Sequence, residues 1–369
     1  MELITQPDDG PSPLLAALKR AKKSIEVAIF RLDRSDIEES LKAAVTRGVK
    51  VTALIAGMNR GGEKGLRLLE TRLLSAGIIV ARTADDLLRY HDKFIIIDRR
   101  VLFILSFNFT HLDIDHSRGF GIISKNTQLV EEAAKLFEAD CARKKYSCPL
   151  ETLVVSPANS RRTLQRFLAG ARKQLLIYDP QIADKEMIGT LQQRVKAGVE
   201  IRIIGKMARL AGVKVHKLTR MRLHTRTIIR DGRQAFIGSQ SLRSAELDSR
   251  RELGVIIRQP KVVNRLLSTF ESDWEAANGT GELHSSDDSE IPEVSKAAAD
   301  RVVSVVAREL RPLAGSVKRA VTKVVAQTGD NVLRDKIVKT TVKKVIKKAV
   351  KKAVKEAVQS AKVESGARL

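Results

Sequence analysis

A short stretch with an unusual residue pattern occurs twice in this chain, which constrains its fold more than any other feature. His91-Asp-Lys93-Phe-Ile-Ile-Ile-Asp98 returns 133 residues later as His224-Thr-Arg226-Thr-Ile-Ile-Arg-Asp231. The same offset relates three further pairs: Ser106 and Ser239, Arg118 and Arg251, and Asp140 and Asp273. Repetition on this scale indicates two similar domains rather than a short-period solenoid.

The match continues upstream at a different offset. Residues 21–27 resemble 171–177, and residues 47–51 resemble 197–201, in both cases 150 residues later. The first copy therefore contains 17 additional residues between this segment and its His. We expect the additional residues to form a helix around Lys64 to Ala76.

Helical and strand patterns alternate within each copy. The first copy predicts a helix over 14–22, a strand over 24–30, a helix over 37–46 and a strand over 49–56, and the second repeats this order over 160–204. Such alternation predicts an α/β sandwich in which helices cover a mixed sheet. Adjacent strands over 90–97 and 101–105, joined by a turn at Asp98, are expected next. An equivalent hairpin over 223–237 and a closing helix over 261–276 follow in the second copy.

The length of 369 residues and the 43% hydrophobic content allow two domains with ordinary cores. We place the first domain at 1–150 and the second at 151–277. Residues 278–300 are polar, acidic and contain Gly, which is typical of a linker. In the tail, 301–369, apolar residues recur every four positions from Val338 to Val358 with Lys pairs between them. This pattern predicts an amphipathic helix with a broad cationic face.

The net charge of +24 predicts attraction to a polyanion, either nucleic acid or an anionic membrane surface. The tail alone contains 18 Lys and Arg against 5 Asp and Glu, so we expect it to bind such a partner.

Two cysteines cannot form a disulfide framework. The first residues lack a secretory pattern, and no apolar run approaches the roughly 20 residues of a membrane span. We expect a cytoplasmic protein, with peripheral attachment to the inner membrane face as an option.

The duplicated motif suits phosphate chemistry. In a strand, residues i and i+2 point to the same side, so His91 and Lys93 are expected on one face, as are His224 and Arg226. An imidazole can attack phosphorus or protonate a leaving oxygen, while a fixed cation neutralises the phosphate oxygens. Two copies related by a pseudo-two-fold axis would place one His on each side of a phosphorus atom. One chain would then supply a complete site.

These residues resemble the phospholipase D superfamily, whose signature is two His-x-Lys-x4-Asp motifs, each followed by a Ser and often an Asn. The resemblance covers roughly residues 13–276. It implies two tandem α/β sandwich domains and a phosphohistidine mechanism that needs neither a metal nor another cofactor. Either His could be the nucleophile; because the first motif is complete, we assign His91 as the nucleophile and His224 as the acid.

The resemblance also implies roles for the surrounding residues. Lys93 and Arg226 would hold the phosphate oxygens, and Ser106, Asn108 and Ser239 would add hydrogen bonds. Asp98 and Asp231 would orient or charge-balance the histidines, and Glu252 matches a Glu often found after the second motif. The sequence departs from the family pattern at three positions: Arg226 replaces Lys, Ser241 replaces the second Asn, and Leu105 replaces a Gly.

Three functions fit this reading. The first is a phosphodiesterase that hydrolyses or transfers phospholipid head groups, which we favour. The second is a metal-independent nuclease with the same chemistry, and the third is a non-catalytic protein that only binds phosphate or nucleic acid. A cleft with an apolar rim would favour lipid, whereas a basic groove crossing both copies would favour nucleic acid.

Overall fold

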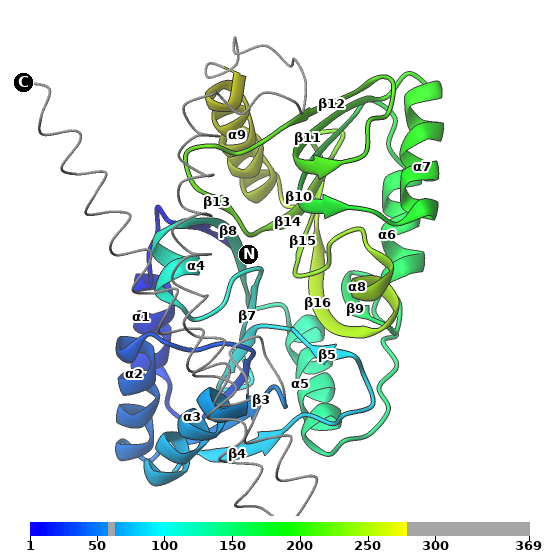
Figure 1. The fold of residues 1–369 in the computed structure, drawn as a ribbon. Coiled ribbons are helices and arrows are strands. Elements are labelled where there is room, and N and C mark those ends of the chain that lie inside the picture. The colour runs from blue at the N-terminus through cyan, green and yellow to red at the C-terminus, as the bar shows by residue number, and fades with distance from the viewer. Residues whose placement is uncertain (58–62, 279–369) are drawn as a thin grey trace, which may run out of the picture. The chain divides into compact units, whose positions relative to one another are not determined.

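Two eight-stranded mixed sheets, one from each copy of the repeat, form the frame of the molecule (Figure 1). The structure is a computed structural model that describes residues 1–57 and 63–278. The expected two tandem α/β domains are confirmed. The predicted tail at 301–369 and almost all of the predicted linker lie outside the described residues.

The first half contains the elements β1 (Glu2–Gln6), α1 (Ser12–Arg20), β2 (Ser24–Ile29), α2 (Ser35–Thr46), β3 (Lys50–Ile55), α3 (Glu63–Ser75), β4 (Ile79–Arg82), β5 (Arg89–Tyr90), β6 (Phe94–Ile97), β7 (Val101–Leu105), α4 (His111–Asp115), β8 (Ser117–Ser124) and α5 (Thr127–Cys141). Its sheet has the order β1-β8-β7-β6-β2-β3-β4. Helix α3 is the element that we expected from the additional residues of the first copy.

The second half contains β9 (Leu153–Ser156), α6 (Ser160–Ala169), β10 (Gln174–Ile182), α7 (Lys185–Lys196), β11 (Glu200–Met207), β12 (Val213–His216), β13 (Arg222–Leu223), β14 (Arg226–Arg230), β15 (Gln234–Gly238), α8 (Ser244–Asp248), β16 (Arg250–Ile257) and α9 (Pro260–Asn278). Its sheet has the order β12-β11-β10-β14-β15-β16-β5. The segment β14-β15-β16-α9 repeats β6-β7-β8-α5.

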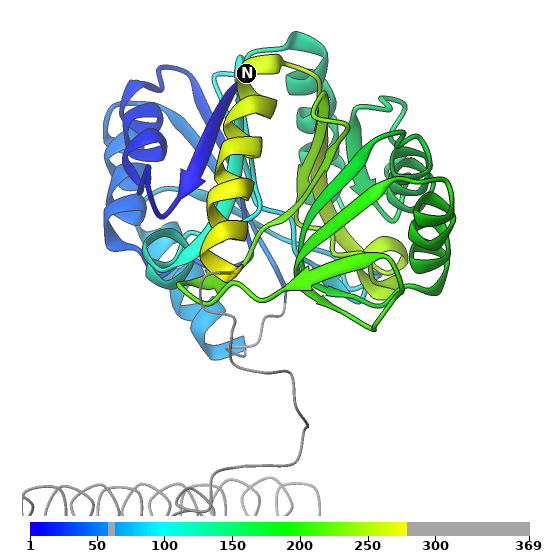
Figure 2. The ribbon, with the colours of Figure 1, turned by 90° about the horizontal axis from the view of Figure 1, so that it is seen from above.

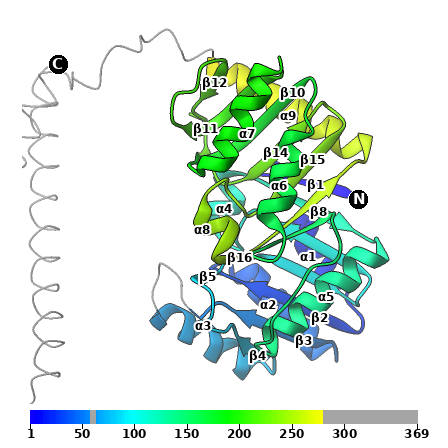
Figure 3. The ribbon, with the colours of Figure 1, turned by 90° about the vertical axis from the view of Figure 1, so that its right-hand side faces the viewer.

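Three hydrophobic cores hold these layers together. The largest lies between the two sheets and includes Phe137 of α5 and Phe270 of α9. Figure 2 shows α9, in yellow, between the sheets, and Figure 3 shows the two halves from the side. The other two cores lie under the outer helices, one beneath α1, α2 and α3 and one beneath α6 and α7. Because the central core draws side chains from both halves, the halves form one packed body.

Each half sends a short strand into the sheet of the other half. Strand β5 pairs in parallel with β16, and β13 pairs in parallel with β8. Each of these two-residue strands ends directly before a motif His, because His91 follows β5 and His224 follows β13. Sequence periodicity cannot reveal strands this short, since two residues carry no alternation.

Two buried ion pairs join the halves in the same reciprocal way. Arg118 Nε lies 2.8 Å from Asp273 Oδ2, and an Arg251 guanidinium nitrogen lies 2.9 Å from Asp140 Oδ1. All four side chains are less than 10% exposed. The repeat register that relates Arg118 to Arg251 and Asp140 to Asp273 is therefore explained by contact, since each Arg binds the Asp of the other copy.

No helix in the described ranges, 1–57 and 63–278, is long and apolar enough to cross a membrane.

Breaking one buried pair should destabilise the protein strongly, because the remaining charge stays buried without its partner. We expect Arg118→Leu to lower the free energy of unfolding by about 3 kcal/mol or more. The matched control is Arg166→Leu, because Arg166 lies 3.7 Å from Glu151 in a pair that is 69% and 85% exposed. The control should change stability by less than about 1 kcal/mol. Denaturant unfolding would measure both, and equal losses would contradict a structural role for the buried pair.

Candidate active site

Both motif histidines lie where the chain passes from one sheet to the other, and each is held by the other half. The His91 N–H donates to the Arg251 carbonyl at 2.7 Å, and the His224 N–H donates to the Arg118 carbonyl at 3.1 Å. Residues 91–93 and 224–225 lie outside regular strands. The expectation that each motif His shares a strand face with its cation is therefore wrong, both for His91 with Lys93 and for His224 with Arg226. The crossing strand ends at Tyr90, and strand β6 begins only at Phe94.

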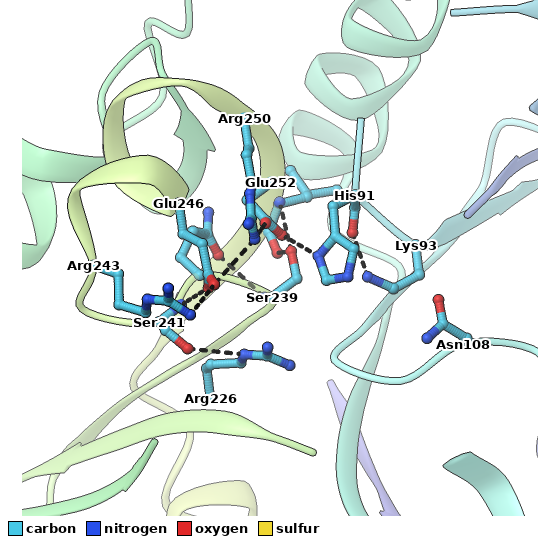
Figure 4. Close-up of polar contacts among 12 residues, drawn as sticks. His91, Lys93, Asn108, Arg226, Ser239, Ser241, Arg243, Glu246, Arg250 and Glu252 are labelled. Carbon is cyan, nitrogen blue, oxygen red and sulfur yellow. Dashed lines mark hydrogen bonds and ion pairs between the residues drawn. The ribbon is translucent and has the colours of Figure 1, made fainter. Parts of the chain in front are cut away.

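Glu252 on β16 is the hydrogen-bond partner of His91. His91 Nδ1 lies 2.8 Å from Glu252 Oε2, as Figure 4 shows, and the Glu252 side chain is completely buried. The Phe30 ring packs edge-on against the imidazole with 4.5 Å between the ring centroids. These contacts fix the ring, and because Nδ1 is engaged by Glu252, Nε2 is the ring nitrogen that can react.

Burial shifts both groups of this pair toward their neutral forms. Burial, followed by the positive charges of Lys93 and Arg226, holds the pKa of His91 well below its ordinary value. Burial also raises the pKa of Glu252 to about 8, against the opposing effect of Lys93. Neutral imidazole is the form that can attack phosphorus, because its free nitrogen keeps a lone pair.

The partner of His224 is Asp113, on the short helix α4. His224 Nε2 lies 3.5 Å from Asp113 Oδ2. Asp113 is also bound by the Arg222 guanidinium and accepts hydrogen bonds from the backbone and side-chain amides of Asn108, at 2.8 and 2.6 Å. Burial alone would raise the pKa of Asp113, but the His224 charge and the Arg222 hydrogen bond outweigh it and lower the pKa. Burial holds the pKa of His224 well below its ordinary value, and the Asp113 carboxylate opposes this shift. Asp113 is therefore the group that favours the protonated form of His224.

The two motif cations are anchored in the same manner. Lys93 Nζ donates to the carbonyl of His91, and the Arg226 guanidinium donates to the carbonyl of His224 at 2.7 Å. Burial lowers the pKa of Lys93 to about 7. Bound phosphate would favour the charged form of this amine, since a nearby anion raises the pKa of a base.

Asp98 and Asp231 hold the fold and not the histidines, which corrects the role that we expected for them. Both lie in hairpin turns with positive φ, at 53° each. Asp98 accepts hydrogen bonds from the backbone amides of residues 22–24, and Asp231 does the same with residues 172–174. The spacing of the motif thus ties each hairpin turn to the start of the strand that pairs with the hairpin, β2 in the first half and β10 in the second. The carboxylates that contact the histidines are Glu252 and Asp113.

Ser106 and Ser239 follow directly after β7 and β15, and their hydroxyl groups contact the neighbouring strand. Ser106 Oγ accepts from the Phe120 amide at 2.9 Å, and Ser239 Oγ accepts from the Leu253 amide at 3.2 Å. Each is fully buried. A hydroxyl that accepts one hydrogen bond can still donate its proton, so donation to phosphate stays a prediction for Ser106. The Ser239 hydroxyl donates to the Leu253 carbonyl at 3.4 Å, so its proton has a partner within the sheet.

The three departures from the family pattern have distinct surroundings. Ser241 accepts a hydrogen bond from Arg226 Nε at 3.2 Å. The two departures are therefore in contact, with Arg in place of the smaller Lys and Ser in place of the larger Asn. Leu105 is completely buried in the outer core of the first half. A Cβ atom on Gly121 would lie only 2.7 Å from a Leu105 methyl group, so Leu105 fills the space that Gly121 leaves open. Leu105 thus serves packing.

The sequence did not predict Asp113 or Phe30 as residues of the site. It predicted Glu252 but not that Glu252 contacts His91. A signal for Asp113 was available, because the 133-residue register relates it to Glu246. Both acids accept a backbone hydrogen bond from the residue five positions earlier, Asn108 and Ser241 respectively. Phe30 has no such counterpart, since a single aromatic at a strand end is common in any core.

Groups from both halves act on one another at this site. Lys93, Arg226 and His224 all contribute to lowering the pKa of His91, so their charges lie within electrostatic range of its ring. Two imidazoles, two cations and two carboxylate partners thus belong to one electrostatically coupled group that draws on both halves. Within the part of the chain that the structure describes, no three His, Cys, Asp or Glu side chains are grouped to hold a metal ion.

Comparison with known proteins identifies the family of the chain. The family model described as cardiolipin synthase, PLD-like domain, matches residues 14–141 and again 164–274. The chain therefore belongs to the phospholipase D-like family, with two such domains in tandem. A polyphosphate kinase of Vibrio vulnificus (strain YJ016) is 25% identical over 273 residues, which cover 66% of this chain and 39% of the kinase. The mitochondrial cardiolipin hydrolase of Mus musculus is 32% identical over 131 residues, covering 34% of this chain and 56% of the hydrolase. The chain thus spans well under two thirds of these curated relatives.

Solved structures share the fold at low sequence identity. Polyphosphate kinase from Porphyromonas gingivalis superposes with a TM-score of 0.63 at 20% identity, covering 74% of this chain and 47% of the kinase. Phosphatidylserine synthase of Haemophilus influenzae Rd KW20 superposes with a TM-score of 0.55 at 12% identity, covering 74% of this chain and 85% of the synthase. These likenesses establish the fold alone.

The buried Glu252 should make stability depend on pH in a defined direction. Its pKa is raised to about 8 in the folded protein, so the folded state holds this proton more tightly than the unfolded state. Its contribution to stability is present at low pH and is lost as pH rises toward about 8. We therefore expect wild type to lose more stability than Glu252→Gln between pH 5 and pH 9. Denaturant unfolding at both values would test this, and identical slopes would contradict it.

Proposed function

We propose that this protein is a phosphodiesterase that works through a covalent phosphohistidine, with His91 as the nucleophile and His224 as the acid. The supporting observation is that the imidazoles of His91 and His224, whose side chains are 10% and 12% exposed, each contact a buried carboxylate of the opposite half. Lys93 and Arg226 both act electrostatically on His91. Attack by His91 Nε2 forms the nitrogen–phosphorus bond. The bond from phosphorus to the leaving oxygen breaks, and this oxygen takes a proton from His224.

The second step returns the enzyme to its starting state. His224, now neutral, accepts a proton from water, and the resulting oxygen attacks phosphorus as the bond to His91 breaks. Attack by Nε2 requires that Nδ1–H donates to Glu252, whose Oε2 lies at 2.8 Å. The positive charge that develops on the His91 ring favours the ionised form of Glu252 over the neutral form that burial favours, and the carboxylate stabilises that charge in return. Lys93 and Arg226 neutralise charge on the non-bridging oxygens. If an alcohol replaces water, the same steps transfer the phosphoryl group.

We propose a phospholipid as the substrate. A cavity of about 380 Å³ adjoins the site, because Asp113 is one of its lining residues. Four leucines line it, namely Leu32, Leu66, Leu69 and Leu112, together with Arg31 and Arg72. An apolar cavity beside a phosphate-binding centre suits a molecule with a phosphate group and a hydrocarbon part. Asp33 and Asp113 line the same cavity, so the charges of its lining balance, and the four leucines are the observation that supports a lipid.

Nucleic acid is the second candidate, and charge is the observation that favours it. Residues 1–277 contain 48 Lys and Arg against 32 Asp and Glu, so a strong positive charge remains without the tail. Near the catalytic centre, Arg31, Arg89 and Lys93 all lie within 6 Å of the Phe30 ring centroid. Cations beside an aromatic ring suit a single strand, in which phosphates alternate with bases that can stack.

A leucine substitution should separate the two candidates. Leu112 is 50% exposed and lines the cavity, so Leu112→Gln should fold normally. We expect it to raise KM about fivefold or more for phosphatidylglycerol in vesicles, since one buried leucine contributes about 1.5–3 kcal/mol. Turnover of the soluble diester bis(4-nitrophenyl) phosphate should not change. Leu74→Gln is the matched control, because Leu74 is 52% exposed and does not line the cavity.

The same panel would include single-stranded and double-stranded DNA and RNA. Turnover of nucleic acid with no turnover of lipid would overturn the lipid proposal and leave the histidine mechanism standing. Failure to turn over every diester, or turnover that survives both His91→Ala and His224→Ala, would overturn the mechanism itself.

A further inference from the structure

The second half contains a basic cavity on its flank, away from the paired histidines. Helix α6, the segment around residues 148–152 and the ends of β14, β15 and β16 enclose it, with a volume of about 170 Å³. Four arginines line it: Arg162, Arg166, Arg230 and Arg258. Glu151 is the one acidic residue among its lining residues, and its side chain is 85% exposed. The lining is therefore strongly cationic.

Arg230 is held in place at this cavity. One guanidinium nitrogen donates to the Phe167 carbonyl at 2.9 Å and the other donates to Gln234 at 2.6 Å, while the guanidinium also lies 4.6 Å from the Phe167 ring centroid. Burial lowers the pKa of Arg230, Asp231 opposes this effect, and Arg258 adds to it. Arg230 is thus a fixed cation with another cation nearby.

The first half provides an internal comparison, because an equivalent cavity lies at the same place in its repeat. Ile97 occupies the position of Arg230, Val101 that of Gln234, and Ala17 that of Phe167. Asp98 and Glu2 also line this cavity, whose volume is about 520 Å³. The same fold therefore forms here with an apolar residue at the position of Arg230. Packing of the repeat does not require Arg230.

We propose that the basic cavity of the second half binds a small phosphate-bearing anion, either a free diphosphate or a phosphomonoester head group. Guanidinium groups bind phosphate oxygens with paired hydrogen bonds, and several arginines together match a multiply charged anion. The volume is below the roughly 300 Å³ at which sites for drug-sized molecules begin, so a compact group fits better than a chain. This site is separate from the histidine centre and does not depend on the proposed function.

Calorimetric titration of the full chain with pyrophosphate tests the proposal. The double variant Arg162→Gln/Arg258→Gln removes two cations from the rim of this cavity and keeps Arg230, which its hydrogen bonds hold in place. We expect pyrophosphate to bind this variant at least about tenfold more weakly than wild type, since two charge-assisted contacts are lost. Turnover of a soluble diester should stay unchanged, because neither residue belongs to the histidine centre.

The matched control is Arg20→Gln/Arg100→Gln, which removes two arginines from the equivalent cavity of the first half. It should bind pyrophosphate within about twofold of wild type. Equal affinity in all three proteins, or the same loss in both double variants, would overturn the proposal, because either result assigns the binding to other parts of the chain or to net charge. Arg230→Ile is a second test, provided that its unfolding temperature equals that of wild type. We expect this variant to bind pyrophosphate more weakly than wild type as well.

Phosphatidate vesicles distinguish the two sources of the phosphate group. Vesicles that displace pyrophosphate from wild type and not from the rim variant would identify a head group. Pyrophosphate binding without such displacement would identify a free anion.

Discussion

The site depends on one constraint: each half binds the segment of the other half that contains the motif His. The chain before each motif His joins the sheet of the opposite half, and the His amide then donates to a carbonyl of that half. That carbonyl belongs to Arg118 or Arg251, whose side chain forms a buried ion pair across the same boundary. Neither half can position its own His without the other. A complete site therefore requires both halves to be packed together.

The sequence predicted the main elements and the paired histidines because both leave long, regular signals. Helices such as α7 and strands such as β3 span several turns or alternations, and the duplicated motif was visible in the residues themselves. The crossing strands β5 and β13 were missed because they contain only two residues each. For the same reason, the sequence placed His91 and Lys93 on one strand, where the structure has a crossing between two sheets.

The roles of the acids show why a motif and its mechanism need separate arguments. Asp98 and Asp231 belong to the repeated pattern, yet their carboxylates bind backbone amides and hold the hairpin turns. The acid beside His91 comes from the other half, and the acid beside His224 comes from α4 of the first half. Such partners are distant in sequence, so spacing alone cannot identify them. The register between Asp113 and Glu246 was the available signal.

The central claim is that His91 forms the covalent intermediate while His224 acts as the acid and base. The direct test is to stop the reaction of His224→Asn with a soluble diester in alkali and map the adduct by peptide mass spectrometry. Loss of the residue that activates water should let the intermediate accumulate, and alkali preserves phosphohistidine. The account predicts an adduct on His91 that is absent from His91→Asn. An adduct on another residue, or normal turnover in either variant without any adduct, would contradict it.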